Sequence, residues 1–443
     1  MKQYDVIVAG GGTAGVSAAI AAARRGSNTL VIEQYGHLGG TAVGGIPFLG
    51  ALDGSGRVVN RGIFLEIVDR LKKENACFGY AQGSRWNTED DYQFSLVPFD
   101  PEIYKYVAQE MVLESGADIL LHTYVTDVKV ENGRIQSVEV ANKSGKQLIN
   151  AKTFVDCTGD ADLVAMAGGK FIENSSRQNC SILFRAGNVD LDMLEEDLKN
   201  GRSIAGWGEW HTRVTRGQKI GTEKPGLIHL AGHMVFGPDE PEITFTAVSV
   251  REGEVSLNAT RVPGLCAFDG NDVTKAEILE RKNVMRIFKM MRERIPSFKN
   301  AVLIGTSPIG FRESRNILGD YILTKDDVLK GARFSDGVAQ GAYPIDIHDP
   351  NGGRTKFMFI KDGGSYEIPY RCLIPVDLKN VLVAGKTISA THEANGSSRI
   401  MACVISQGEA AGTAASVCIK NEADTRSVDG TQLKKTLGIN ENY

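Results

Sequence analysis

The chain has 443 residues, of which 42% are hydrophobic and 23% charged, and a formal net charge of −4. This length allows one large or two to three ordinary domains, and the near-balance of charge argues against a general binder of nucleic acids or anionic membranes. No stretch approaches about 18 uninterrupted apolar residues, and the chain enters a strand too early for a signal peptide, so we expect a cytoplasmic protein without a membrane span.

The N-terminal segment predicts a dinucleotide site. Residues 4–9 form a short apolar run typical of a buried parallel strand, and Gly10, Gly12 and Gly15 follow in the spacing G-x-G-x-x-G. An Ala-rich helical stretch and a second apolar run come next, and Glu33 ends that run. Gly10 permits the tight turn, Gly12 lets a pyrophosphate approach the backbone, and Gly15 lets the helix pack on the strand. The pyrophosphate then meets the positive helix N-terminus, and Glu33 accepts from a ribose hydroxyl.

Further elements follow in the first 170 residues. A helix is predicted to begin at Asp100-Pro101, because proline is common at the first helical position. A β-hairpin is predicted to turn at Asn132-Gly133. Residues 151–159 then give another buried strand, which ends with glycine as the first strand does.

The pattern changes after about residue 170. The middle of the chain predicts antiparallel strands joined by turns, followed by a long charged amphipathic helix. These predicted strands are residues 226–236, 243–250 and 254–262, and the predicted helix is residues 272–294.

From residue 380 the first pattern returns, with a buried strand ending at Gly385 and a long helix rich in small residues. We therefore predict an α/β protein with a Rossmann-like nucleotide-binding domain, built on a parallel sheet from residues 1–170 and 371–443. An inserted, mainly antiparallel α+β substrate domain is predicted over residues 171–370.

The chain resembles a bacterial FAD-dependent oxidoreductase family of the glutathione-reductase-like, two-domain flavoprotein superfamily. Members carry the segments GGGxAG, LGGT, VDxTGD and AGxxISxTHxAxxxxR, which stand here at Gly10–Gly15, Leu38–Thr41, Val155–Asp160 and Ala384–Arg399. The resemblance covers nearly the whole chain, since RESRNILGDYILTKDDV and YPIDIHDP also match. It implies an extended FAD whose flavin ring lies between the two domains.

Three glycine-ended strands agree with such a cofactor. Parallel α/β sheets bind ligands at the carboxyl ends of their strands, and a ligand as long as FAD would use the segments at Gly10, Gly159 and Gly385, whereas a mononucleotide needs only the first. The predicted cofactor-binding residues are Gly10, Gly12, Thr13, Ala14, Gly15, Glu33, Gln34, Gly39, Gly40, Thr41, Val125, Thr158, Gly159, Asp160, Gly385, Ser398, Arg399 and Ile400.

The catalytic candidates come from the middle and end of the chain. His392 lies in a predicted loop before the last helix, where the resemblance places the flavin, and it is either a general base or a structural histidine. Arg312 and Arg315 flank a carboxylate in RESR, and they either clamp an anionic substrate or form an interdomain ion-pair network. Tyr343 and His348 complete the set, with His348 as a candidate substrate ligand.

We predict an FAD-dependent oxidoreductase that transfers a hydride between a small-molecule substrate and flavin N5, with an unknown electron donor or acceptor. Two alternatives stay open, namely an electron-transfer flavoprotein subunit and a non-redox or sulfur-transfer protein on the same fold. The seven cysteines are scattered without a C-x-x-C pair, so neither an iron–sulfur cluster nor any metal is predicted. The oligomeric state stays open, with a homo-oligomer as one option.

Overall fold

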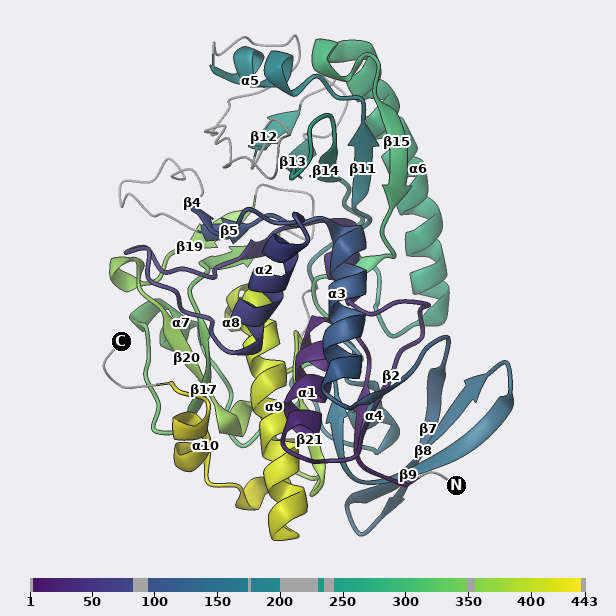
Figure 1. The fold of residues 1–443 in the computed structure, drawn as a ribbon, viewed down its shortest axis with the longest axis vertical. Helices are drawn as coiled ribbons and strands as arrows, with labels where there is room; N and C mark the ends of the chain where they lie inside the picture. The colour runs from purple at the N-terminus through teal and green to yellow at the C-terminus, as the bar shows by residue number, and fades with distance from the viewer. Residues whose placement is uncertain are drawn as a thin grey trace.

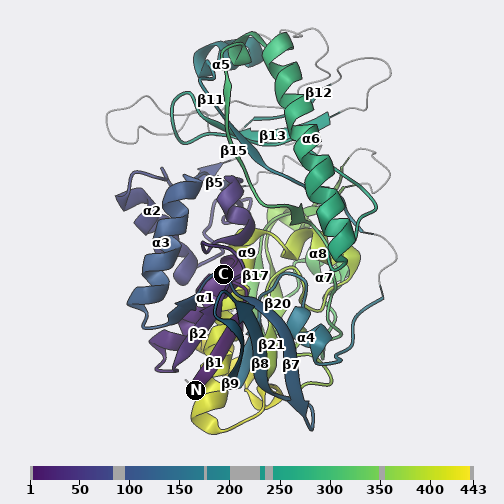
Figure 2. The same cartoon turned by 90° about the vertical axis from the view of Figure 1, so that its right-hand side faces the viewer.

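The computed structural model describes residues 3–82, 95–173, 177–199, 230–234, 243–348 and 355–439. Figures 1 and 2 show a larger α/β body below and a smaller body above. The long helix α6 (Gly270–Arg294) runs beside the smaller body. None of the described helices combines the length and apolar character needed to cross a membrane.

A seven-stranded, mainly parallel sheet organises the larger body, in the order β6-β2-β1-β9-β8-β7, with β21 also paired to β9. The first half of β9 pairs antiparallel with β8, while its second half lies parallel between β1 and β21. The strand bounds are β1 Gln3–Ala9, β2 Thr29–Ile32, β6 Asp118–Leu120, β7 Tyr124–Glu131, β8 Arg134–Asn142, β9 Gly145–Asp156 and β21 Val381–Val383. The predicted α/β architecture with a parallel Rossmann-like sheet is confirmed.

Two local predictions for this body are also confirmed. The β7–β8 hairpin turns at Asn132 (φ 52°) and Gly133 (φ 75°), and positive φ at both central positions is what a type I′ turn requires. Helix α3 (Pro101–Glu114) has proline in its first turn, and the Asp100 side chain accepts hydrogen bonds from the N–H groups of Glu102 and Ile103 in the same turn. Short-range chemistry is sufficient to specify both features.

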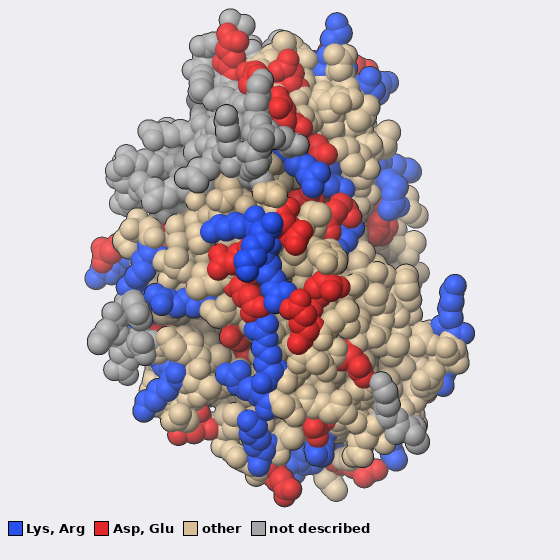
Figure 3. Space-filling model, viewed as in Figure 1, with Lys and Arg blue, Asp and Glu red and all other residues tan. Residues whose placement is uncertain are grey.

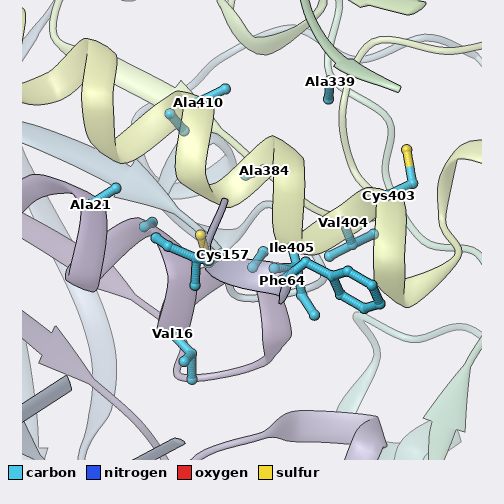
Figure 4. Close-up of a cluster of buried hydrophobic side chains, with 14 of the residues drawn as sticks. Val16, Ala21, Phe64, Cys157, Ala339, Ala384, Cys403, Val404, Ile405 and Ala410 are labelled. Atoms are coloured by element: carbon cyan, nitrogen blue, oxygen red, sulfur yellow. The ribbon is translucent and has the colours of Figure 1, made fainter. Parts of the chain in front are cut away.

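The two ends of the chain share one core, because α1 (Thr13–Arg24) packs along α9 (Met401–Asn421). Small residues permit a close approach: a Cβ on Gly408 would lie 2.1 Å from the Ala14 carbonyl oxygen, and one on Gly412 would lie 2.1 Å from that of Ala18. Figure 4 shows side chains of both helices, such as Val16 and Ile405, in the same buried cluster. Helices α2 (Ile63–Lys73) and α3 lie beside this pair (Figure 1).

The face seen in Figure 3 carries both signs of charge. Basic side chains run down its middle, with acidic side chains beside them. Among the described residues, Arg24 pairs with Glu66, and Arg70 pairs with both Glu66 and Glu114, so charges on α1, α2 and α3 neutralise one another. This face therefore presents no extended surface of one sign.

The smaller body has its own antiparallel sheet, in the order β12-β13-β14-β11-β15, and its own buried cluster against α6. Its strands are β11 Phe184–Gly187, β12 Leu230–Met234, β13 Ile243–Val248, β14 Val255–Asn258 and β15 Val302–Thr306, and α5 (Leu191–Lys199) covers one end. The predicted inserted antiparallel part is thus confirmed, although 226–229 and 235–242 lie outside the described residues.

The segment predicted as one middle domain contributes to both bodies. Residues such as Leu323, Val338, Ile345 and Tyr366 belong to the core that also contains α1 and α9. The remaining elements are β3 Phe48–Leu49, β4 Ala81–Gln82, β5 Ser95–Val97, α4 Asp162–Met166, β10 Cys180–Ser181, β16 Gly310–Phe311, α7 Lys325–Lys330, β17 Gly337–Gly341, β18 Ile345–Ile347, β19 Lys356–Met358, β20 Tyr366–Pro369, α8 His392–Ser398 and α10 Gly430–Thr436. The predicted domain boundaries, at about residues 170 and 371, stay a prediction.

Substituting Gly412 with alanine should destabilise the protein, although alanine is the better helix former by roughly 1 kcal/mol. The new methyl group would overlap the Ala18 backbone, and overpacking of this kind typically costs about 1–3 kcal/mol. Urea denaturation should show a lower midpoint for Gly412→Ala. Gly270→Ala is the control, because a Cβ there has no atom within 4 Å, and equal midpoints for the two variants would contradict the packing argument.

Candidate functional site

The carboxyl ends of β1, β9 and β21 meet at one edge of the sheet, since Ala9 and Val383 are both in register with Asp156. Gly10 follows β1 with φ 93°, and a Cβ there would lie 2.3 Å from the Cys157 carbonyl oxygen. A Cβ on Gly15 would lie 1.8 Å from the Gly10 carbonyl oxygen. These two glycines are therefore required by the turn and by helix–strand packing.

Gly12 is different, because neither its backbone nor its neighbours demand glycine. Its φ is −66°, and a Cβ would meet no atom nearer than the Gly40 Cα at 4.0 Å. Gly39 forms an isolated parallel bridge with Gly12, so the glycine-rich segment runs beside the first turn of α1. Among the described residues, no side chain caps α1. An open glycine surface beside an uncapped helix N-terminus fits a bound pyrophosphate.

Glu33 fits the ribose role predicted for it. Its side chain is buried, and its carboxylate accepts from the Gly11 N–H at 2.7 Å and from the Tyr35 N–H at 2.9 Å. An ionised carboxylate has about four acceptor sites, so capacity remains for a ligand hydroxyl. Burial raises the pKa of Glu33 despite these backbone hydrogen bonds. The chain near Val125 lies close to Glu33, because Thr123, two residues earlier, donates its N–H to the Glu33 carbonyl. The side chain of Gln34, the other predicted residue here, is exposed.

The loop after β9 is fixed by two cations. Thr158 donates to the Asp156 carboxylate at 2.8 Å, and Gly159 adopts φ 83°. Lys386 lies 3.5 Å from Asp160 Oδ1, and Arg315 donates to the Asp160 carbonyl at 2.9 Å. Lys386 was not predicted, and its position inside the AGxxIS segment was the available signal.

The connection between β21 and α9 corrects one prediction. A loop was expected to carry His392, but the structure has the short helix α8, because the Thr391 side chain caps it by accepting the Ala394 N–H. The Gln407 side chain on α9 connects the end of β21 to the end of α8. It accepts the Gly385 N–H at 3.0 Å and donates to the Ser398 carbonyl at 2.8 Å.

The junction of α8 and α9 also offers polar groups to a ligand. The Ser398 hydroxyl is buried and has no hydrogen-bond partner within the described part of the chain. Ile400 occupies the N-cap position of α9, and no side chain caps this helix either. A buried free hydroxyl beside an uncapped helix N-terminus is what a polar cofactor edge would satisfy.

His392 pairs with Glu313, which is 79 residues away in the chain. The imidazole Nδ1 lies 2.7 Å from Glu313 Oε1, and the Glu313 side chain is 0% exposed, against 22% for His392. Glu313 also accepts the Gln178 backbone N–H at 2.7 Å. The hydrogen bond that His392 makes to Glu313 raises the pKa of His392, although burial opposes this. In the sequence, Glu313 is only a neighbour of two arginines, and no local signal links it to His392.

Arg312 and Arg315 do not form the predicted clamp, because their side chains contact different groups. Arg312 donates to the Asn179 carbonyl at 2.8 Å and to the Ser181 hydroxyl at 2.7 Å. Arg315 pairs with Asp162 at 2.9 Å, and its guanidinium lies 4.1 Å from the centre of the Phe268 ring. Both arginines follow β16 (Gly310–Phe311) in a segment without regular secondary structure, so no strand or helix periodicity keeps their side chains on one face.

Tyr343 and His348 both lie inside the protein. Tyr343 is 5% exposed and packs with Leu96, Leu49 and Ile400 in a small apolar cluster. His348 Nε2 lies 3.4 Å from Asp346 Oδ1, and burial lowers the pKa of His348 to about 3. The imidazole of His348 is therefore neutral near pH 7.

Comparisons with known proteins identify the family. A family model described as FAD dependent oxidoreductase matches residues 5–437. Digeranylgeranylglycerophospholipid reductase of Thermoplasma acidophilum is 27% identical over 222 residues, which are 46% of this chain and 52% of that enzyme. An uncharacterised Methanosarcina barkeri protein encoded near nifH2 is 26% identical over 182 residues, 40% of this chain and 93% of its own.

Among solved structures, p-nitrophenol 4-monooxygenase from Pseudomonas putida DLL-E4 superimposes with a TM-score of 0.52 at 10% identity, covering 99% of this chain and 86% of that one. This likeness shows the fold. The chain belongs to the FAD-dependent oxidoreductase family, and FAD is its cofactor.

Placing a branched side chain at Gly12 should remove FAD without unfolding the protein. Gly12→Val fills space that the protein itself leaves open, so flavin affinity should fall about tenfold or more, equivalent to roughly 1.4 kcal/mol. Flavin-to-protein ratios after dialysis measure this, alongside thermal unfolding of the flavin-free forms. The control Gly305→Ala has no atom near its Cβ, and full flavin retention by Gly12→Val would exclude the assigned role.

Proposed function

We propose that this FAD-dependent oxidoreductase transfers a hydride between a small-molecule substrate and FAD, with His392 handling the accompanying proton. The observation that carries the proposal is the His392–Glu313 pair, a partly exposed imidazole hydrogen-bonded at 2.7 Å to a fully buried carboxylate. A carboxylate only accepts, so Nδ1 of His392 holds the proton and Nε2 remains available to a substrate. Imidazoles arranged in this way act as general acids and bases.

The pair is placed beside the strand ends by backbone contacts. Asn316 donates through its side chain to the Lys386 and Ile388 carbonyls, and the Ile317 N–H donates to the Thr387 carbonyl. The segment that carries Glu313 therefore runs alongside the segment between Gly385 and His392. This arrangement supports a proton-transferring group close to the predicted flavin position.

FAD, when bound, accepts or donates a hydride at its N5 atom. The protein's part is to orient the substrate, to hold or receive the proton at His392 Nε2 and to exclude water. The apolar cluster of Tyr343, Leu96 and Ile400 supports water exclusion near the start of α9. We include in the proposal the two-domain, glutathione-reductase-like arrangement, with residues 171–370 as the substrate domain.

Anaerobic titration of the purified holoprotein tests the proposal. Sugars, hydroxy acids, amines and enoates should be screened for bleaching of the oxidised flavin spectrum, or for reoxidation of the photoreduced one. A two-electron spectral change with one compound, and product formation in equal amount, would support hydride transfer. Exchange of electrons only with a protein partner, and with none of these compounds, would favour the electron-transfer alternative.

Replacing His392 with alanine should leave flavin bound and slow flavin reduction by roughly a hundredfold or more, the usual contribution of a general acid or base. Stopped-flow spectroscopy with the substrate found above measures the reduction rate. Glu409→Gln, on α9, serves as the control and should reduce at the parent rate. Identical traces for His392→Ala and the parent would remove His392 from the mechanism.

Glu313→Gln should move the His392 limb of the pH–rate profile to lower pH. The Glu313 hydrogen bond and charge raise the pKa of His392, with Glu393 adding to this and burial and Arg399 opposing it, so loss of the carboxylate lowers that pKa. If the enzyme oxidises its substrate, neutral His392 is the base and the acid limb of the profile moves to lower pH. If it reduces its substrate, protonated His392 is the acid and the alkaline limb moves to lower pH. Glu409→Gln, which removes another largely buried carboxylate, should leave the limb in place. An unmoved limb in Glu313→Gln would contradict the pairing.

A further inference from the structure

We propose that the substrate carries a carboxylate group, and that Arg261, Arg312 and Arg399 bind it beside the His392–Glu313 pair. This inference rests on the proposed function, because it assigns the substrate class of the same site. It differs from the clamp predicted by sequence, which paired Arg312 with Arg315.

A short three-stranded arrangement brings Arg261 and Arg312 together. Cys180 in β10 is paired on one side with Phe311 of β16 and on the other with Val262. These three side chains share one apolar cluster. Because side chains alternate along extended chain, the neighbours Arg261 and Arg312 lie toward the other face, where Arg312 donates to the Ser181 hydroxyl.

Arg399 reaches the same region from the end of α8. Its guanidinium donates to the Asp346 carbonyl at 3.1 Å and to Gln178 Oε1 at 3.4 Å, and it lies 3.9 Å from Asp346 Oδ2. The three arginines lie close enough for Arg261 and Arg399 both to repel the charge on Arg312. Burial and this repulsion lower the pKa of Arg312, and burial lowers the pKa of Arg261.

The positive charges exceed the negative ones in this cluster. Asp346 is the carboxylate common to the arginines, and neighbouring charges hold its pKa below the ordinary value although burial opposes this. His348 is neutral, and burial raises the pKa of Glu280, on α6, to about 7. Three guanidinium groups therefore face the full negative charge of Asp346 and the partial negative charge of Glu280. Buried charge of one sign is costly unless a counter-charge is supplied, and an anionic ligand would supply it.

Several hydrogen-bond donors of the cluster also lack partners. Arg399 Nε and Gln178 Nε2 are buried without a hydrogen-bond partner among the residues that the structure describes. The Gln178 side chain is 2% exposed, and its oxygen is already engaged by Arg399 and by the His348 N–H. A carboxylate only accepts hydrogen bonds and offers about four sites, so it satisfies such donors better than a neutral hydroxyl or amine.

Gln178 joins this cluster to the proton-transferring pair. Its backbone N–H donates to Glu313 Oε2 at 2.7 Å, while its side chain contacts Arg399. A substrate carboxylate held by the arginines would therefore lie close to His392. Such a substrate has its carboxylate at one end and its reacting carbon toward the flavin and His392.

Isothermal titration of the flavin-loaded protein with malonate, succinate and glutarate tests the inference. The matched diamides serve as uncharged probes, and inorganic phosphate as a non-carboxylate anion. At least one dicarboxylate should bind and perturb the flavin spectrum, while its diamide should not. Arg261→Gln should weaken this binding about tenfold or more, and Arg281→Gln, an exposed arginine on α6, should not. Arg261→Lys keeps the charge but loses the bidentate hydrogen-bond donor, so its dicarboxylate affinity should lie between those of Arg261→Gln and Arg281→Gln.

Three results would overturn the inference: no dicarboxylate binding to a protein that retains FAD, binding of phosphate but of no carboxylate, or equal binding by Arg261→Gln and the parent. Failure of the proposed function looks different, since dicarboxylates would then bind through Arg261 while no compound exchanges electrons with the flavin. Conversely, a neutral substrate that bleaches the flavin of Arg261→Gln at the parent rate would retain the proposed function and overturn the carboxylate assignment.

Discussion

The structure depends on the close packing of α9 against α1, where a Cβ on Gly408 or on Gly412 would lie 2.1 Å from a carbonyl oxygen of α1. This contact brings the C-terminal segment over the N-terminal glycine turn. Gln407, one residue before the first of these glycines, then fixes both the end of β21 and the end of α8. The position of His392 at the start of α8 therefore follows from how closely two small-residue helices approach each other.

The electrostatics of the site divide into a compensated and an uncompensated part. The Glu313 carboxylate is fully buried, and it is compensated by His392 and by the Gln178 N–H. The arginine cluster is less complete, because Arg399 Nε is buried without a partner among the residues that the structure describes. Buried polar groups are normally satisfied in folded proteins, so unpartnered buried donors beside the His392–Glu313 pair are the feature that points to a ligand.

Two bodies with separate cores contribute to this site. The larger body supplies the strand ends, Glu33 and His392, while Arg261, Arg312 and Gln178 come from the segments that join it to the antiparallel body. Membership of the FAD-dependent oxidoreductase family establishes the cofactor and the class of reaction. The substrate depends instead on the connecting segments, where side-chain chemistry can change without disturbing the nucleotide fold.

The sequence alone determined the features that neighbouring residues control. Positive φ at Asn132 and Gly133 makes the hairpin, Asp100 caps α3, and the spacing of Gly10 and Gly15 follows from backbone contacts within one turn. Only the tertiary structure decided the partner of Glu313, the separation of Arg312 from Arg315, and the position of Arg261 beside Arg312 and Arg399. The physical reason is range: steric limits, capping and turn geometry act over a few residues, whereas these contacts join segments that meet only after the sheet and its helices have packed.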